Sequence, residues 1–174
     1  MIIEPISKKQ REQVCDATVA CLRRAGELFQ IDFEPVPVSF DLTARAAGMY
    51  RSARGEHLIR YNPYIFAKYF SNNLGITVPH EVAHYITDRL YGLHNIRPHG
   101  AEWKAVMQAL GAEPRATARY DLEGIPVRRQ RRFSYRCDCN THQLSTARHN
   151  RMRRGQAAYY CRVCRAALVL DAAE

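Results

Sequence analysis

The sequence lacks any long apolar run, contains a single tryptophan, and has few acidic residues in its C-terminal part. No stretch approaches the roughly 18 apolar residues of a membrane-spanning helix, which argues against a helical membrane protein. Residues 1–13 have no apolar run after their basic residues, so we expect no export signal and a cytoplasmic location. With 174 residues, the chain is long enough for one well-buried core and a small appendage.

The shortage of acidic residues is a local feature. Residues 127–174 contain three acidic residues against eleven arginines, whereas the part before them is nearly balanced in charge. Because the positive charge is concentrated in one segment, it indicates a surface that binds a polyanion rather than a general adaptation for solubility.

The apolar spacing of the first sixty residues is typical of a mixed α+β fold. Residues 9–29 repeat apolar side chains with a helical period. Residues 33–42, 47–51 and 56–61 predict three short strands, of which the last two form a hairpin. We therefore expect a small sheet covered by a surface helix.

Further helices are expected after the strands. Asn62-Pro63 is typical of a helix start, and a second helix carries residues 78–91 to a stop near Gly92. Pro79 either lies in the first turn of that helix or kinks a longer one that begins near Asn73. A third helix is predicted from about His99 to Leu110.

A metal-binding pattern lies on the second of these helices. His80 and His84 are four residues apart, so both imidazoles lie on one face and can bind one Zn²⁺ ion. Glu81, between them, points beside the metal, where it can act as general base for an attacking water. Asp88 follows His84 by one turn and can either orient its imidazole or remain a solvated surface acid.

A catalytic zinc needs a third protein ligand and an open fourth position. The metzincin pattern is excluded because Thr87 and Leu90 stand where it requires Gly and His. We favour His99, which is expected at the start of the third helix, with His94 and Glu102 as alternatives. Glu102 can also orient His99 from one turn away or be a solvated acid.

Two cysteine pairs near the C-terminus predict a structural zinc site in a segment too small to bury a core of its own. The first pair is C-x-C instead of the usual C-x-x-C, and Arg165 stands where a Gly usually completes the knuckle. His142 or His149 can replace Cys139, and unligated thiols are the bland alternative. The favoured ligands are Cys137, Cys139, Cys161 and Cys164.

The arginine-rich tail also contains aromatic residues, and this combination is typical of sequence-tolerant binding to single-stranded DNA. A solvated basic face with packed tyrosines is the alternative interpretation. The predicted nucleic-acid contacts are Arg128, Arg129, Arg131, Arg132, Arg148, Arg151, Arg153, Arg154 and Tyr159.

The segments VPHEVAHYI and RPHGAEWKAVMQALG resemble the SprT family of zinc metalloproteases, to which the eukaryotic protein Spartan is related. The segment YRCDCNTHQLSTARHNRMRRGQAAYYCRVC resembles the zinc ribbon of bacterial members. The resemblance implies a catalytic zinc held by His80, His84 and His99, with Glu81 as base. It also implies that the substrates are proteins bound or crosslinked to DNA.

Together these patterns predict an α+β, zincin-like metalloprotease domain at residues 1–126 and a basic zinc-ribbon domain at 127–174. The leading hypothesis is a zinc endopeptidase recruited by DNA. A nucleic-acid-binding regulator with a non-catalytic zinc site is the alternative from another class, and a hydrolase of a small amide is a third possibility.

Overall fold

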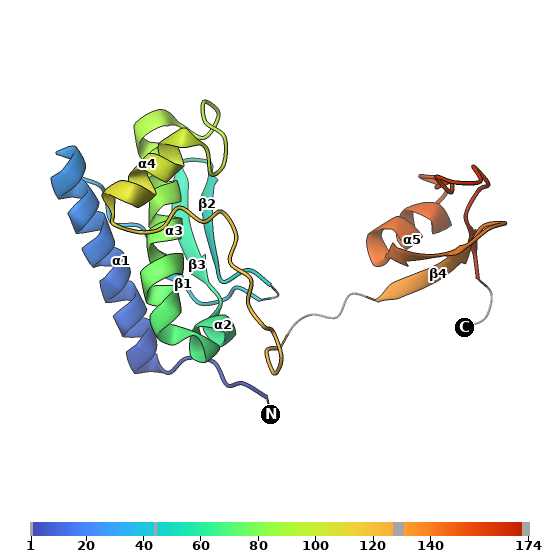
Figure 1. Ribbon diagram of the computed structural model, residues 1–174, viewed down its shortest axis with the longest axis horizontal. Coiled ribbons are helices and arrows are strands. Elements are labelled where there is room, and N and C mark those ends of the chain that lie inside the picture. Colours follow the sequence, from blue (N-terminus) through green and yellow to red (C-terminus); the bar gives the residue numbers. More distant parts are fainter. Residues whose placement is uncertain (1, 44, 127–130, 172–174) are drawn as a thin grey trace. The chain divides into compact units, whose positions relative to one another are not determined.

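The computed structural model describes residues 2–43, 45–126 and 131–171. It divides into two compact units, Met1–Val127 and Arg128–Glu174, called here the N-terminal and the C-terminal unit (Figure 1). Both contain helices and strands, which confirms the α+β class. The predicted boundary after residue 126 adjoins residues 127–130, which lie outside the described part of the chain.

Helix α1, Lys8–Phe29, covers one side of the N-terminal unit, in agreement with the predicted helix. It begins with a capping box, in which the Ser7 side chain and the Gln10 side chain each accept a hydrogen bond from the other's backbone N–H. This arrangement satisfies N–H groups that have no partner within the helix. The helix ends at Gln30, which has a φ of 54°.

The N-terminal unit contains a three-stranded sheet with the order β1-β3-β2. Strands β2, Gly48–Ala53, and β3, Glu56–Tyr61, form the predicted antiparallel hairpin. Arg54 and Gly55, at its turn, both have positive φ values, as the preferred two-residue hairpin turn requires. Because β2 is an outer strand in the order β1-β3-β2, it lies at an edge of the sheet.

The prediction of a strand over residues 33–42 is mostly wrong. Only β1, Val38–Ser39, forms, and it pairs in parallel with β3. Pro35 and Pro37 lack backbone N–H groups and cannot donate to a ladder, which explains why the rest of the segment is not a strand.

Helices α2, Pro63–Lys68, and α3, Phe70–Tyr91, follow the sheet, and the Asn62 side chain caps α2. Pro79 lies inside α3, so the longer of the two predicted helices is the correct one, and it begins earlier than expected. Helix α4, Ala101–Ala109, begins two residues after the predicted start at His99.

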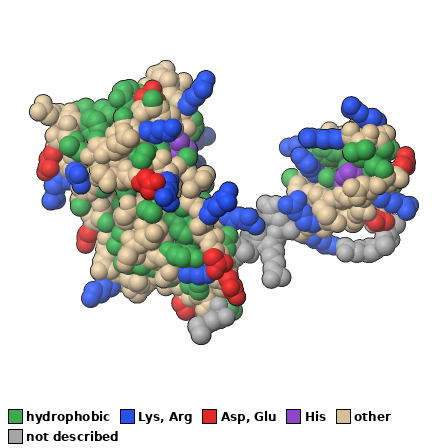
Figure 2. Space-filling view, viewed as in Figure 1, with side chains coloured by type: hydrophobic (Ala, Val, Ile, Leu, Met, Phe, Trp, Pro, Cys, Tyr) green, Lys and Arg blue, Asp and Glu red, His purple; other side chains and the backbone are tan. Residues whose placement is uncertain are grey.

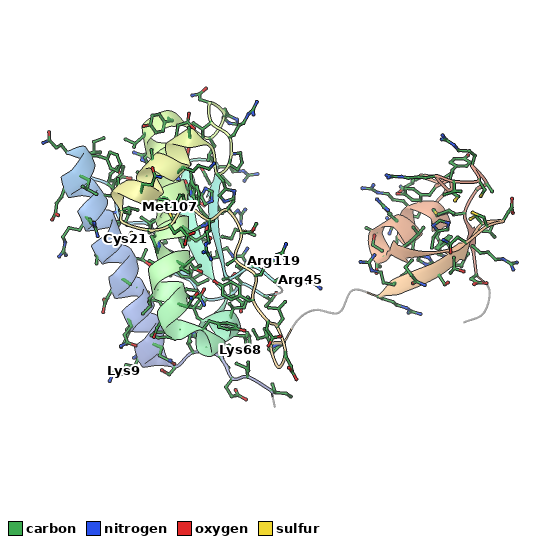
Figure 3. All side chains as sticks on the ribbon, viewed as in Figure 1. Lys9, Cys21, Arg45, Lys68, Met107 and Arg119 are labelled. Atoms are coloured by element: carbon green, nitrogen blue, oxygen red, sulfur yellow. The ribbon has the colours of Figure 1, made fainter. Side chains whose placement is uncertain are left out.

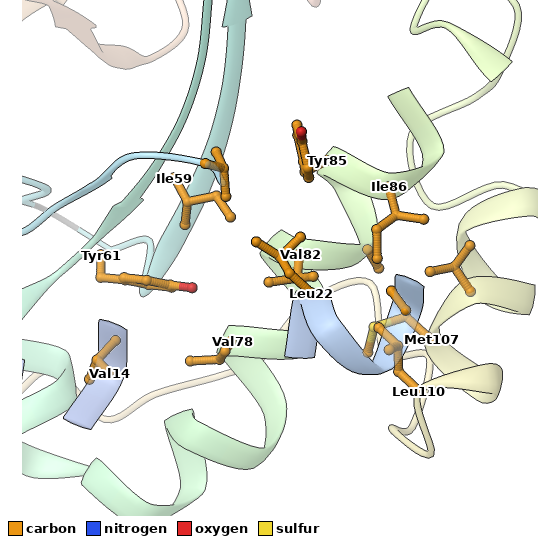
Figure 4. Close-up of a cluster of buried hydrophobic side chains, with 14 of the residues drawn as sticks. Val14, Leu22, Ile59, Tyr61, Val78, Val82, Tyr85, Ile86, Met107 and Leu110 are labelled. Atoms are coloured by element: carbon orange, nitrogen blue, oxygen red, sulfur yellow. The ribbon is translucent and has the colours of Figure 1, made fainter. Parts of the chain in front are cut away.

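Helix α3 contacts α1, α4 and strand β2, and its apolar side chains contribute to the main hydrophobic core (Figure 4). Val82, Ala83 and Ile86 are fully buried there. The core thus supports the face of α3 opposite to its histidines. Among the described residues, no helix combines the length and apolar character that crossing a membrane requires.

The C-terminal unit contains a second antiparallel sheet with the order β5-β4-β6. Its strands are β4, Arg132–Arg136, β5, Thr141–Ser145, and β6, Val169–Leu170. Helix α5, Thr146–Arg153, lies between the cysteine pairs. Apolar periodicity does not predict α5, because His149 is its one buried residue and the helix has no apolar face.

Candidate metal centres and nucleic-acid interface

Three histidines of the N-terminal unit converge on one point. The Nε2 atom of His84 lies 3.2 Å from that of His80 and 3.1 Å from that of His99. The Nε2 atoms of His80 and His99 are 3.1 Å apart. The structure therefore brings together the three residues that the sequence favoured as ligands.

This histidine triangle fits a zinc ion. Each neutral Nε2 carries either a proton or a lone pair, so three such atoms cannot all satisfy one another by hydrogen bonds. Bonds of about 2.0–2.1 Å to one Zn²⁺ at tetrahedral angles would separate the nitrogens by about 3.3 Å, close to the observed spacing. Burial lowers the pKa of His80 to about 4 and that of His84 to about 3, which favours the neutral form that binds metals.

Backbone geometry explains how His99 reaches the triangle. His99 has a φ of 57°, a left-handed conformation that is uncommon for a residue other than glycine. Gly100 then caps α4, so His99 precedes the helix instead of opening it. His94 is exposed and does not belong to the described cluster of potential ligands.

Trp103 is a site residue that the sequence reasoning missed. Its ring centroid lies 4.7 Å from those of His80 and His99 and 5.6 Å from that of His84. The Trp103 side chain is 1% exposed, so it is a buried ring that packs against all three imidazoles. Trp103 is the single tryptophan of the sequence and follows His99 by four residues. These two features could have indicated that it belongs to the site.

Glu81 is held beside the histidines by strand β2. Its Oε2 atom accepts a hydrogen bond of 2.7 Å from the backbone N–H of Tyr50, and the residue is 5% exposed. Burial raises the pKa of Glu81 to about 8, and the Tyr50 hydrogen bond acts in the opposite direction. A Cβ atom on Gly48 would lie 2.6 Å from Cγ and Oε1 of Glu81, so this approach requires glycine.

An open cleft of about 350 Å³ gives access to these groups, and we call it the catalytic cleft after Glu81, the predicted general base. One wall is the edge of β2 and the other is the loop after α3. His80, His84 and His99 line it together with Glu81. Apolar residues complete the walls: Met49, Leu93, Ile96, Pro98 and Trp103.

Asp88 has a different partner from the one expected. Its Oδ2 atom accepts a hydrogen bond of 2.5 Å from the Tyr50 hydroxyl, and its Oδ1 atom accepts one from the Leu93 N–H. The same hydroxyl lies 2.6 Å from His57 Nδ1. Asp88 therefore ties β2 and the following loop to α3. Within the described residues, neither Asp88 nor Glu102 hydrogen-bonds to a histidine of the triangle.

The C-terminal unit holds a second cluster of potential ligands, formed by the four predicted cysteines. The Sγ atom of Cys139 lies 3.6 Å from that of Cys137 and 3.7 Å from that of Cys161. Zinc–sulfur bonds of about 2.3 Å at tetrahedral angles give sulfur separations of about 3.8 Å, so the spacing suits zinc. Backbone N–H groups of Cys164 and Val163 lower the pKa of the Cys161 thiol to about 6.

The two histidines considered as substitutes differ in position. His142 Nε2 lies 3.2 Å from Cys137 Sγ, beside the cluster. His149 is buried, stacks on Phe133 at 3.6 Å between ring centroids, and its Nδ1 atom lies 3.0 Å from the Tyr135 hydroxyl. His149 therefore packs against Phe133 and Tyr135 inside the C-terminal unit. Arg165 has a φ of 64°, so it adopts the conformation for which glycine is usual.

The predicted nucleic-acid contacts lie mainly on the surface of the C-terminal unit (Figure 2). Arg131 lies over the ring of Phe133 at 4.9 Å, and Arg148 lies over Tyr159 at 5.5 Å. Arg151 and Arg153 belong to the last turn of α5, and Arg154 caps its end. Arg128 and Arg129 lie outside the described residues.

The SprT-like family model matches residues 18–130. A relative named Protein SprT from Pseudomonas paraeruginosa is 39% identical over 155 residues, covering 87% of this chain and 90% of the relative. The chain belongs to the SprT-like family. This finding confirms the resemblance that the histidine and cysteine segments indicated.

Other SprT-like relatives agree in length and extent. Protein SprT from Vibrio parahaemolyticus is 36% identical, covering 84% of this chain and 85% of the relative. The one from Pasteurella multocida is 31% identical over 91% of this chain and 93% of the relative. No solved structure matches the chain. In this SprT-like chain, the ligand roles of the histidines and cysteines stay predictions, supported by the metal fit above.

Proposed function

We propose that the chain is a zinc-dependent endopeptidase with a zincin-like catalytic unit, recruited by DNA to proteins bound or crosslinked to it. One observation carries the peptidase assignment: three histidine Nε2 atoms meet beside a buried carboxylate at the free edge of a strand. The triangle alone would suit a structural metal. The addition of an acid and an open cleft favours chemistry on a substrate.

Glu81 is the general base and His80, His84 and His99 hold the zinc. Bound zinc supplies Lewis acidity to the scissile carbonyl and to the attacking water. Glu81 takes the proton of that water and transfers it to the leaving amine. The hydrogen bond from Tyr50 N–H to Oε2 fixes the carboxylate for both transfers.

Strand β2 aligns the peptide. Because the Tyr50 N–H donates to Glu81, it points away from β3. In an antiparallel pair, the backbone N–H and C=O groups of successive residues point alternately toward the partner strand and away from it. The backbone groups of Gly48 and Ser52 therefore also point to the open edge. An extended peptide can add to that edge as a further strand, with its side chains directed alternately into the cleft.

The C-terminal unit binds single-stranded DNA and holds a structural zinc on its four cysteines. Guanidinium groups neutralise phosphates, and exposed aromatic faces stack on unpaired bases. Tyr160 is 61% exposed beside the stacked Arg148–Tyr159 pair. A cytoplasmic location belongs to the same proposal, since thiols remain available as metal ligands in a reducing compartment.

The decisive experiment compares wild type with Glu81→Gln. Cleavage of a DNA-binding protein, and of the chain itself, is measured with and without a single-stranded oligonucleotide. We expect DNA to stimulate cleavage by the wild type, with the stimulation falling steeply as salt is raised. Loss of the general base should reduce the rate by about 10²–10⁴-fold.

Glu12→Gln on α1 is the matched control, because it makes the same change at an exposed position and should cleave like wild type. Equal inactivity of wild type and Glu81→Gln, with zinc and DNA still bound, would contradict the peptidase assignment. It would favour a DNA-binding regulator instead. Cleavage unaffected by DNA or salt would instead contradict recruitment.

A further inference from the structure

A second cavity adjoins the catalytic cleft, and we call it the basic cavity. Its volume is about 350 Å³. Its walls come from residues 45–48 at the start of β2, from α3, and from residues 115–118 with Tyr120. Gly48, His80 and Glu81 line both spaces. The two therefore meet at the general base.

The two spaces differ in chemistry. Beyond the histidines and Glu81, the walls of the catalytic cleft are mainly apolar, and Arg97 is the arginine in its lining. The basic cavity is lined by Arg45 and Arg115 and by small residues of the 115–118 segment. Among the described residues, Arg45 forms no ion pair, while Arg115 pairs at 2.6 Å with Glu113. Both partners of that pair are more than 60% exposed, so an incoming carboxylate can replace Glu113 at little cost.

The wall that carries Arg115 is fixed relative to the catalytic groups. The backbone of Arg115 hydrogen-bonds to His80. Farther along, the Tyr120 hydroxyl donates to Asn73 Oδ1 at 2.7 Å and lies 3.1 Å from Thr77 Oγ1, both on α3. Arg45 (Figure 3) lies three residues before Gly48, the first residue of β2, which closely approaches the Glu81 side chain.

The direction of a bound peptide decides which of its residues meets this cavity. Antiparallel pairing is the more stable arrangement along a strand edge. A peptide antiparallel to β2 has its N-terminal side beside Ser52, in the catalytic cleft. Its C-terminal side then passes Gly48 and enters the basic cavity. The scissile bond lies between the two, beside Glu81.

We propose that Arg45 and Arg115 select acidic side chains on the C-terminal side of the scissile bond, while the apolar walls accept the N-terminal side. This inference rests on the proposed peptidase function and adds the substrate class to it. Two positive charges in the lining next to the reaction centre attract carboxylates and disfavour lysine or arginine at the same place.

The test uses three peptides that differ at the two positions before and the two positions after the cleaved bond. The first has Glu at both positions after the bond and Gln at both before it, and the second has the reverse arrangement. The third has Gln at all four positions. We expect kcat/KM for the peptide with Glu after the bond to exceed that of the Gln peptide by about fivefold. This is the size of effect that partly exposed ion pairs usually produce. Glu before the bond should give a smaller gain, because Arg97 is the arginine lining the catalytic cleft whereas Arg45 and Arg115 both line the basic cavity. Product masses identify the cleaved bond.

The variant Arg45→Glu/Arg115→Glu should abolish this preference in the full-length chain. Arg54→Glu, an exposed residue of the β2–β3 turn outside both spaces, makes the same kind of charge change and should keep it. Equal cleavage of all three peptides by wild type, or an unchanged preference in the double variant, would overturn the inference while leaving the peptidase assignment intact.

Binding provides a readout that does not depend on turnover. In the Glu81→Gln background, fluorescence anisotropy should show tighter binding of the peptide with Glu after the bond, and the two arginine changes should remove the difference. If this holds while wild type cleaves nothing, the peptidase function fails and the binding preference stands. If the changes weaken only single-stranded DNA binding, the basic cavity serves a phosphate backbone and the inference is wrong.

Discussion

The two units hold their clusters of potential metal ligands in different ways. In the N-terminal unit two histidines of the triangle lie on α3, whose opposite face is buried in a core of seventeen described residues. In the C-terminal unit the described core consists of Tyr135, Leu144, Cys161 and Leu168. One of those four belongs to the cysteine cluster itself. The difference predicts that the N-terminal unit folds without metal, whereas the C-terminal unit needs metal to fold.

The largest expected effects come from removing one ligand in each unit. Cys161→Ser should unfold the C-terminal unit, because structural zinc contributes about 10–16 kcal/mol to folding of small zinc domains. Limited proteolysis should then digest residues beyond 131 and spare α3. His84→Ala should leave both units folded while zinc content falls and cleavage is lost. Unfolding of the N-terminal unit in His84→Ala would break the comparison.

A cavity in the core should affect the N-terminal unit alone. Ile86 is fully buried on the back of α3, so Ile86→Ala should lower the free energy of unfolding by about 2–5 kcal/mol. Denaturant titration of the zinc-free chain measures this. Val163→Ala, at a residue that is 84% exposed in the C-terminal unit, should change stability by less than about 0.5 kcal/mol.

The contact between β2 and Glu81 sharpens the comparison at the site itself. Gly48→Ala places a Cβ atom 2.6 Å from the Glu81 side chain, and such overpacking typically costs about 1–3 kcal/mol. Thermal unfolding should show this loss together with reduced cleavage. Gly75→Ala, at a helical position with free space around it, should instead stabilise by about 0.5–1 kcal/mol. Equal effects would exclude a special role for Gly48.

The smallest effect is expected from a surface pair. Hydrogen bonds from Arg60 and Ser39 lower the pKa of Asp41 from 3.8 to about 2. A lowered pKa in the folded state stabilises the protein above about pH 4, and this contribution disappears as the pH falls through 2. Asp41→Asn should therefore lower the melting temperature slightly at pH 6 and not at pH 2. Exposure of the Asp41 side chain, at 59%, keeps the effect small.

The sequence predicted what depends on short spacing and missed what depends on tertiary packing. His80, Glu81 and His84 share one helical turn, so their arrangement follows from the periodicity of a helix. The same holds for the hairpin at Arg54-Gly55. His99 was chosen for the wrong local reason, since its left-handed backbone precedes α4.

Longer-range relations had no signal in the sequence. The links from Tyr50 to Glu81 and Asp88 depend on how β2 lies against α3, and no periodicity encodes that placement. The approach of Arg45 and Arg115 to one cavity brings together residues seventy positions apart in the sequence. Helix α5 was missed because polar residues dominate it and its neighbours in the sheet determine its position.

The most direct test of the contrast between the two units is residue-resolved amide hydrogen exchange on the metal-free and the zinc-loaded chain. Opening of a structural unit controls the exchange of its hydrogen-bonded amides. We predict that α3 amides stay protected in both states, whereas those of β4 and β5 lose protection when zinc is removed. Protected β4 and β5 amides without zinc, or exchange-prone α3 amides, would contradict it.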